Sequence, residues 1–532
     1  RPAGGRLAPA LAVGLAGLVA LLGRAGPAAA TGFTDIGQDI EARSELELEL
    51  DGALRLRGAL LHNLDLDRGP TPSGELFFPV PPSDPRAQLL THADMRLRND
   101  LAVYVPAASM AVKLRLDVVD NLALGSAPAG PPVGALGQQP PAVALRVRRA
   151  YGEALLPFGL LAAGRMGSHW GLGMLTHGGD CADCDSGDAA DRIALITPLA
   201  GHVWALAYDF SASGPDAQRR DGRRSIDLDP SDDVRTVTLA VLDFRHPLAL
   251  QRRRLAGKTS FEYGLYAAYR WQDDDIPASY LPLASEVPID GGQVMARGLH
   301  AVAADLWLRL THPRFRIEAE AAVIWSRIDQ PSLLPGALLH QPLEALQFGA
   351  AVESQIGAPE DAWVFGLDGG FASGDPAPGF GAFVDVGDAA PRRGDLQGAQ
   401  AVPPYDNRLD NFRFHPDYRI DRILFREIVG TVTDAFYLRP HLRWRMLELG
   451  PGRLELALAA VASFAVRTES APGGERPLGV EIDPSLGWIN ERGFSVVLDY
   501  AALFPLAGLD NPQLGLGAEP AQLARLRVVY AY

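Results

Sequence analysis

Hydrophobic and polar side chains alternate with a period of two along much of the chain, most clearly in VALRVRRAYGEALLPFGLLAAGRMGSHWGLG at 143–173. There Leu145 and Val147 alternate with arginines, which gives an extended strand one apolar and one cationic face. The LPFG sequence predicts a tight turn and therefore a hairpin. Arg149 falls out of phase with this alternation, and a β-bulge near Arg148 would restore the phase.

Similar segments recur along the whole chain, separated by stretches rich in turn residues. They number about 18, with 16 as the alternative count. We expect strands near residues 46–63, 90–105, 109–124, 142–155, 159–169, 191–197, 202–212, 233–246, 259–273, 296–311, 315–328, 343–356, 362–374, 431–447, 452–468, 478–490, 493–506 and 521–532.

The connections between these segments alternate in length. Short turns at one end of the strands and long loops at the other are typical of an outer-membrane barrel, with its turns in the periplasm and its loops outside the cell. We therefore predict an all-β fold, a transmembrane antiparallel β-barrel. A soluble β-solenoid or a multi-sheet sandwich is the alternative. The short connections include 106–109, 156–157, 198–201, 312–314 and 450–451, and the long ones centre on 64–88, 125–141, 170–190, 213–232, 274–294 and 375–430.

The two faces of individual strands support a lipid-facing exterior. Phe261, Leu265 and Tyr269 share one face of their strand, while Glu262 lies on the other. A closed barrel pairs every backbone group within the membrane, so its outward side chains can be apolar and its inward ones polar. The last ten residues, LARLRVVYAY, also alternate and end in an aromatic residue. This ending resembles the signal that outer-membrane barrels present to the barrel-assembly machinery.

The N-terminus predicts export. A basic start, an apolar run and the small residues Ala28 to Ala30 are typical of a signal peptide over residues 1–30, so residues 31–532 would form the barrel. A single membrane anchor is the alternative reading of this stretch. No later run is long and apolar enough for a membrane-spanning helix.

Composition narrows the range of functions. The counts of 56 glycines and 42 prolines are typical of many turns and long loops, and the mean hydropathy is near zero. The net charge of −15 argues against a nucleic-acid partner, because phosphate binding requires positive charge.

The sequence RRAYGEALLPFGLLAAGRM resembles the strand, FG turn and GR strand of Gram-negative porins. The likeness in layout covers essentially the whole mature chain. It implies a water-filled channel and a homotrimer. The sequence GRMGSHWGLGML, with the following DCADCDSGDAADR, also resembles an uncharacterised family of predicted outer-membrane proteins from myxobacteria, a likeness that implies no activity.

Charged residues on the polar faces are the candidate pore lining. Basic residues gather on the first five strands and on the last strand, whereas acidic residues gather on the later strands. We expect a lumen that is basic on one side and acidic on the other, which would orient polar solutes. Salt bridges that close the lumen are the alternative. The basic set is Arg55, Arg57, Arg96, Arg98, Lys113, Arg115, Arg146, Arg148, Arg165, Arg525 and Arg527, and the acidic set is Glu262, Asp305, Glu318, Glu320, Glu353, Asp368, Glu455, Glu481, Asp483 and Asp499.

Two loops carry further candidates. Residues 375–430 form the longest connection and mix aromatic with charged residues, which favours a lid or a constriction, with a surface cap as the alternative. Asp180, Asp183, Asp185 and Asp188 cluster in another loop, where oxygen ligands could bind Ca²⁺, although a solvated acidic loop is the alternative.

The same acidic loop contains the only two cysteines, Cys181 and Cys184. In an exported loop they predict a local disulfide rather than a redox or zinc site. His169 and Ser168 suggest a hydrolase as a third alternative, but neighbouring strand residues point to opposite faces, and no GxSxG, HExxH or phosphate-loop motif is found.

We therefore expect a non-enzymatic porin of the outer membrane that passes small polar solutes by passive diffusion. It would contact outer-membrane lipids and need no cofactor. A closed structural or adhesive barrel is the main alternative function.

Overall fold

The fold is seen in a computed structural model that describes residues 45–85, 88–125, 127–128, 138–139, 145–218, 222, 225–276, 294–332, 338–381, 391–396, 401, 406–490 and 492–532. The predicted signal peptide lies outside the described residues.

Eighteen strands form one antiparallel sheet that closes on itself. Each strand pairs with the next along the chain, and the last pairs with the first from Ala53 opposite Ala531 to His62 opposite Gln522. The strands are β1 (Glu47–His62), β2 (Leu89–Val105), β3 (Met110–Ala123), β6 (Arg146–Leu156), β7 (Gly159–Gly167), β8 (Ala189–Leu199), β9 (His202–Phe210), β12 (Arg235–Asp243), β13 (Ser260–Asp275), β14 (Met295–His312), β15 (Phe315–Ile328), β16 (Leu343–Ile356), β17 (Trp363–Ala372), β18 (Ala435–Leu449), β19 (Gly452–Ala465), β20 (Pro477–Asn490), β21 (Phe494–Pro505) and β22 (Ala521–Ala531).

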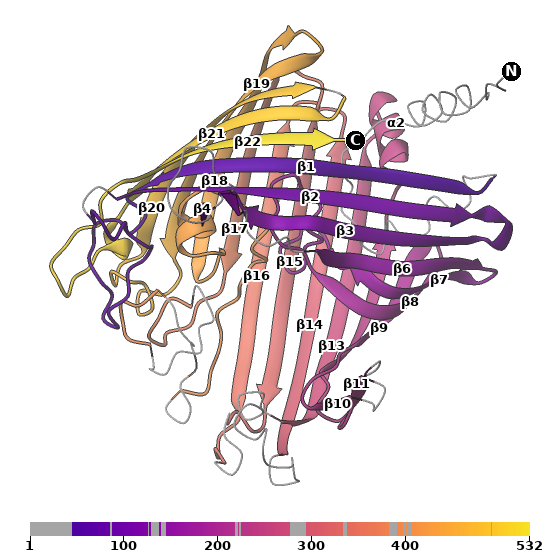
Figure 1. Cartoon of the computed structure of the whole chain (residues 1–532), viewed down its shortest axis with the longest axis horizontal. Helices are drawn as coiled ribbons and strands as arrows, with labels where there is room; N and C mark the ends of the chain where they lie inside the picture. Colours follow the sequence, from indigo (N-terminus) through magenta and orange to yellow (C-terminus); the bar gives the residue numbers. More distant parts are fainter. Residues whose placement is uncertain are drawn as a thin grey trace, which may run out of the picture.

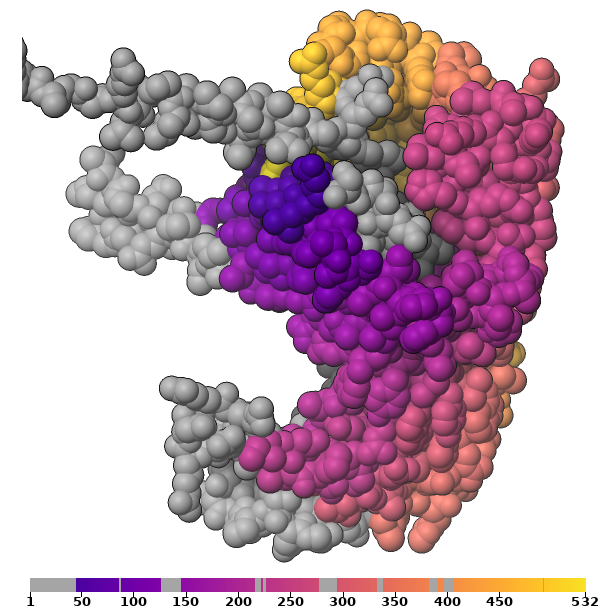
Figure 2. All heavy atoms as spheres, turned by 90° about the vertical axis from the view of Figure 1, so that its right-hand side faces the viewer, coloured from indigo at the N-terminus to yellow at the C-terminus, as the bar shows by residue number. Residues whose placement is uncertain are grey.

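Figure 1 shows β1, β2 and β3 crossing in front of β13 to β16 at a steep angle, as tilted strands on opposite walls of a barrel do. Figure 2 shows the indigo and purple surface of the first strands beside the magenta surface of the middle of the chain. The predicted transmembrane β-barrel and its count of 18 strands are confirmed.

The remaining elements are short and lie in the connections. No helix among the described residues is long and apolar enough to cross a membrane. The short elements are the hairpin strands β4 (Ala127–Pro128), β5 (Gln138–Gln139), β10 (Asp216–Gln218) and β11 (Ser225–Asp227), the α-helix α2 (Pro247–Leu255), the 3₁₀ helices η1 (Pro106–Ala108) and η4 (Ala507–Leu509), and the π-helix η3 (Leu424–Ile428).

The outward face of the barrel is apolar. On β13, Phe261 is 52% and Leu265 is 53% exposed, whereas the intervening Glu262 is fully buried. Outward aromatic rings stack across neighbouring strands, including Trp363 on Trp444 with centroids 4.7 Å apart. An apolar exterior with aromatic residues on a closed, even-numbered barrel is the architecture of bacterial outer-membrane proteins.

The hairpin of β6 and β7 contains the bulge that the sequence predicts. Arg115 pairs with Arg149 and the next residue, Leu116, pairs with Val147, so Arg148 is the extra residue. The turn into β7 needs Gly159, whose φ is +148° and where a Cβ would collide with the carbonyl oxygen of Ile196. The bulge brings Arg149 onto the inward face with Glu153.

Candidate functional site: two loops inside a charged barrel

The 168–188 loop, between β7 and β8, lies across the lumen. Its first part contacts two inward acids: the indole Nε1 of Trp170 donates to Asp305 at 2.9 Å, and the backbone nitrogens of Leu172 and Leu175 donate to Glu320 at 2.5 and 3.1 Å. Because β14 and β15 supply these acceptors, the loop reaches the wall opposite the first strands.

The second part of the same loop contacts arginines of the first strands. Asp180 lies within ion-pair distance of Arg115 and at 3.0 Å from Arg149. Asp185 lies at 3.0 Å from Arg55 and at 2.8 Å from Arg57. The loop therefore connects β1, β3 and β6 to β14 and β15 through its own polar groups.

Asp183 has the most cationic partners in this loop. Arg57 lies 3.2 Å from its carboxylate and Arg527 of β22 lies 2.9 Å from it. Arg419 and Arg426, from the long connection between β17 and β18, lie at 3.5 and 2.5 Å. Four arginines thus converge on one carboxylate.

These arginines keep the aspartates of the loop ionised. Burial alone would raise the pKa of Asp180, but the guanidinium groups of Arg115 and Arg149 lower it below its usual value. The pKa of Asp183 is likewise lowered by Arg426 and Arg527 against the effect of burial. Both carboxylates stay charged at neutral pH and hold their arginines in place.

The 406–434 segment of the long connection forms the second inward part. The backbone nitrogens of Arg422, Ile423 and Leu424 donate to Glu481 of β20 at 2.8, 2.8 and 3.0 Å. The following π-helix η3 is buried, with Leu424 and Phe425 in the large hydrophobic core that fills this part of the barrel. Of the predicted lid at 375–430, the residues from 411 onward therefore lie inside the barrel, residues 406–410 run beside the start of β16, and several earlier ones lie outside the described residues.

The two inward parts contact each other directly. Asp417 accepts hydrogen bonds from the backbone nitrogens of Asp185 and Ser186 at 2.8 and 2.9 Å. The His177 ring stacks on His415 with centroids 5.4 Å apart. We call the 168–188 loop and the 406–434 segment together the plug.

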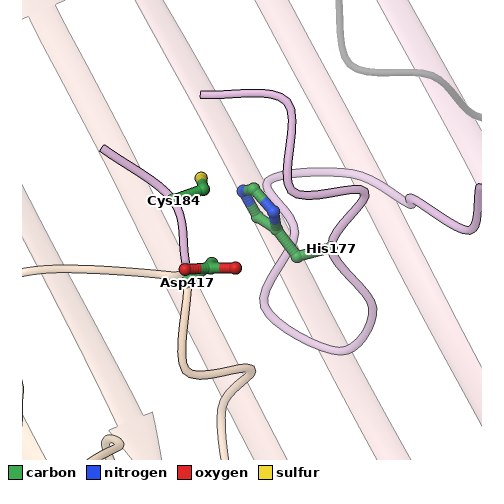
Figure 3. Close-up of side chains that lie close together, drawn as sticks. All are labelled: His177, Cys184 and Asp417. Atoms are coloured by element: carbon green, nitrogen blue, oxygen red, sulfur yellow. The ribbon is translucent and has the colours of Figure 1, made fainter. Parts of the chain in front are cut away.

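Three side chains of the plug lie close enough together to suggest a metal site, but one of them is already part of a disulfide. His177, Cys184 and Asp417 bring one ligand atom each within 4.8 Å of one another and point toward a common space (Figure 3). Cys184 is joined to Cys181 in a disulfide with a Cα separation of 5.1 Å. A disulfide sulfur has no thiolate to offer a metal, so this group is better explained as packing between the two parts of the plug.

All four aspartates predicted as calcium ligands already have side-chain partners within the protein. Asp180, Asp183 and Asp185 pair with arginines, and Asp188 lies 3.5 Å from His415 and accepts from the Thr176 hydroxyl at 2.8 Å. The positive charge that Ca²⁺ would supply is already provided. A calcium ion in this loop stays a prediction without structural support.

Most predicted basic residues lie on the inward face, with two differences at the outer rim. Arg165 is on the outward face: its side chain is 48% exposed and pairs with Asp191 at 2.7 Å. Its prediction as pore-lining is wrong, because it shares the parity of the exposed Leu161. Arg146 is 62% exposed and pairs with Asp120 at 3.2 Å.

The other basic residues have carboxylate or carbonyl partners. Arg96 donates to the carbonyl oxygen of Cys184, and Arg525 pairs with Glu427 at 2.5 Å. The remaining pairs are Arg98 with Asp117 (2.8 Å), Lys113 with Glu153 (3.1 Å) and Arg148 with Asp117 (2.9 Å).

The predicted acidic residues divide into two groups. Asp305, Glu320, Glu353, Glu481 and Asp499 hold the plug, Glu353 through the Tyr418 hydroxyl at 3.3 Å and Asp499 through Arg422 at 2.8 Å. The others pair mainly with cations of the wall: Glu262 with Arg309 (2.8 Å), Glu318 with Arg316 (2.9 Å), Asp368 with Arg439 (2.7 Å) and Glu455 with Arg453 (2.6 Å), while Asp483 is buried on β20.

The sequence reasoning missed several members of the plug and its wall. Arg149 was missed because the bulge at Arg148 changes the face of the residues that follow it. Its shared parity with Glu153 could have revealed it. Arg419, Arg426 and Asp417 lie in an irregular connection, where no period assigns a direction to a side chain.

No known family of proteins matches this chain, and no curated protein matches its sequence. The resemblance to predicted myxobacterial proteins therefore finds no support. Among solved structures, the barrel is similar to OccK11 (OpdR) of Pseudomonas aeruginosa, with 11% identity, a TM-score of 0.45, and coverage of 91% of this chain and 95% of that chain.

It is also similar to Pseudomonas aeruginosa OpdK, solved with vanillate, with 11% identity, a TM-score of 0.44, and coverage of 91% and 98%. A loop-deletion mutant of OmpT, an outer membrane protein of Vibrio cholerae, shares 8% identity with a TM-score of 0.35 and coverage of 92% and 100%. Likeness at this level carries no statement about activity.

Proposed function

We propose that this protein is an outer-membrane channel for small polar solutes in which the plug controls passage. The observation that carries the proposal is the polar attachment of the 168–188 loop, which is held to the walls by ion pairs and by hydrogen bonds to carboxylates. Contacts of this kind can be exchanged for contacts with water or with a charged solute, so this loop could move while the 406–434 segment stays packed in the hydrophobic core.

The periplasmic half of the lumen supports the channel reading. Near the turns at 313–314 and 450–451, inward charges remain in contact with solvent: the Arg316 side chain is 43% exposed and that of Arg443 is 27% exposed. A barrel that served only as a scaffold would not need a charged, solvent-accessible interior on that side. We infer a water-filled vestibule that opens to the periplasm and ends at the plug.

A closed structural or adhesive barrel is the second candidate. The observation in its favour is the density of buried ion pairs around Asp183, because separating four arginines from one buried carboxylate is costly. The outer side is also covered, since Leu61 of β1 packs with Leu66 and Leu509 of the outer loops in one buried cluster. In this reading the plug never moves.

A comparison of two variants distinguishes these functions. The double variant Asp183→Asn/Asp185→Asn removes two plug charges, and we expect it to give larger and more frequent conductance steps in a planar bilayer than the wild type. Its selectivity should also shift toward anions, because the arginines lose their partners. The matched control is Asp191→Asn, which removes a carboxylate from the outward face.

The control should conduct like the wild type. If a folded and inserted double variant stayed silent, the channel proposal would fail and the closed barrel would take its place. Our proposal gives His169 no enzymatic role, since it lies within the plug and its Nδ1 accepts a backbone hydrogen bond from Gly178. Homotrimer formation and recognition by the assembly machinery stay predictions.

A further inference from the structure

A second acidic cluster lies in the 211–234 loop, between β9 and β12, away from the plug. Asp232 in this loop is fully buried. Among the described residues it is the only carboxyl group whose two oxygens are both buried without a hydrogen-bond partner. A buried carboxylate without donors is strongly unfavourable unless a cation or a proton compensates it.

The surroundings of Asp232 add negative charge instead of removing it. Asp227, Asp229 and Asp233 lie close enough to repel its carboxylate. Asp275 of β13 contributes to the same negative field.

Arg235 and Arg297 are described arginines at this end of the barrel, and both are engaged elsewhere. Arg235 donates to the carbonyl oxygen of Pro230 and lies 3.8 Å from Asp273. Arg297 pairs with Asp275 and donates to the carbonyl oxygen of Ser332 at 2.7 Å. Neither guanidinium reaches the carboxylate of Asp232 in the part of the chain that the structure describes.

The backbone holds Asp232 in this position. The Gln272 side-chain amide donates to its carbonyl oxygen at 2.6 Å. On the other side Gly214 has φ of +69°, and a Cβ at that position would collide with the Asp232 carboxylate. The carboxylate is therefore enclosed between the glycine and its acidic neighbours.

We propose that the cluster around Asp232 is a calcium site, with Asp232 as the buried ligand and Asp227, Asp229 and Asp233 as further oxygen donors. Calcium accepts six to eight oxygen ligands in flexible geometry, including carbonyl oxygens and water, whereas magnesium needs a near-ideal octahedron. The alternating acids of DLDPSDD at 227–233 supply such donors.

The site would be completed by a local movement. Three ligand atoms within 4.8 Å of one another occur, in the described chain, only at His177, Cys184 and Asp417. The aspartates around Asp232 are therefore further apart, as mutually repelling carboxylates are expected to be without a cation. Calcium would draw them together.

Binding would attach the 211–234 loop to the barrel. The loop carries the hairpin of β10 and β11 and already meets β13 through the Ser231 hydroxyl, which donates to Asp274 at 2.9 Å. An ion between Asp232 and its neighbours would fix this outer loop at the end of β13. This role is independent of the plug and of solute passage.

The test is calorimetric titration of CaCl₂ into refolded, EDTA-treated full-length protein, with MgCl₂ in parallel. We expect binding near the millimolar range of extracellular calcium modules, on the order of 10⁻⁴ to 10⁻³ M, and at least tenfold weaker binding of magnesium. Asp232→Asn should abolish calcium binding while raising the unfolding temperature measured in EDTA, because it removes an uncompensated buried charge.

Asp229→Asn changes a less buried ligand and should weaken calcium binding about tenfold. This variant tests the site even if Asp232→Asn fails to fold. The control Glu448→Gln removes an exposed carboxylate at the periplasmic end and should bind calcium like the wild type. Wild-type protein without a calcium signal, or Asp232→Asn with unchanged affinity, would overturn the site.

Discussion

Arg149 donates to Asp180 at 3.0 Å and to the carbonyl oxygen of Gly178 at 2.8 Å inside the barrel. Arg165, on the next strand, forms an equally short pair with Asp191 on the outside. The difference lies in the surroundings: the first pair is buried and the second is about half exposed. Exposed ion pairs contribute little, because water screens them.

Substitution of these two arginines should therefore have unequal effects. We expect Arg149→Gln to lower the free energy of unfolding by about 3 kcal/mol, because it leaves a buried carboxylate with one partner fewer. Arg165→Gln should change it by less than about 1 kcal/mol. Urea unfolding of the barrel in lipid vesicles measures both, and equal losses would contradict the assigned faces.

The direction of a single charged residue was only partly predictable from the sequence. Period two places Glu262 inside and Phe261 outside, because apolar and polar positions alternate regularly over the first residues of β13. The same rule places Arg165 outside with Leu161, so its inclusion in the inward basic set went against the rule. At the bulge of β6 the sequence indicated the irregularity but not the new direction of Arg149.

At the scale of elements, strands were predictable and inward loops were not. The predicted segments at 315–328 and 343–356 coincide with β15 and β16, because lipid and lumen impose strict alternation on them. The aspartates of the 168–188 loop could equally face solvent, calcium or arginine. Only closure of the barrel brings β1, β3 and β22 around them, and no local sequence pattern predicts these long-range contacts.

The disulfide in the plug leads to a direct prediction. Cys181 and Cys184 form one loop whose Cys184 carbonyl oxygen accepts from Arg55 at 3.0 Å. Native protein should show no thiol that reacts with maleimide until a reductant is added. After reduction we expect more frequent channel opening, because the carbonyl is less firmly placed. Two free thiols in the untreated protein would contradict the assignment.

The histidines of the plug predict a dependence on pH. Burial, and then the neighbouring His177, lowers the pKa of His169 to about 4, below the usual value of about 6.5. Between these values the unfolded chain binds more protons than the folded one, so stability should fall as pH is lowered from about 6.5 to 4. His169→Gln should flatten this part of the stability curve, measured by urea unfolding at several pH values.

Removal of the longer part of the plug should open the barrel. We expect deletion of residues 380–425 to raise single-channel conductance, because the segment from 406 onward packs between the 168–188 loop and β20. Inserted protein with an unchanged conductance would show that this segment does not obstruct the pore. Heat-modifiable migration on gels serves as the folding control.

The whole molecule combines a rigid lipid-facing wall with an interior in which charges are matched across the lumen. Eighteen strands fix the wall through continuous backbone pairing. The interior places arginines of β1, β3, β6 and β22 against the acids of the plug and arginines of β2 against its carbonyl oxygens. Acids of β15 and β20 accept from its backbone nitrogens, and Asp305 of β14 accepts from the Trp170 indole. Backbone hydrogen bonds thus stabilise the barrel, whereas side-chain contacts hold the plug. We therefore expect the 168–188 loop of the plug to move while the barrel stays folded.

The most direct test of this account is planar-bilayer conductance of the refolded wild type beside Asp183→Asn/Asp185→Asn under a salt gradient. The account predicts small, infrequent steps for the wild type and larger steps for the variant, with a reversal potential shifted toward the anion equilibrium value. Silence from both proteins, once each is shown to be folded and inserted, would contradict a movable plug and make the barrel a closed one.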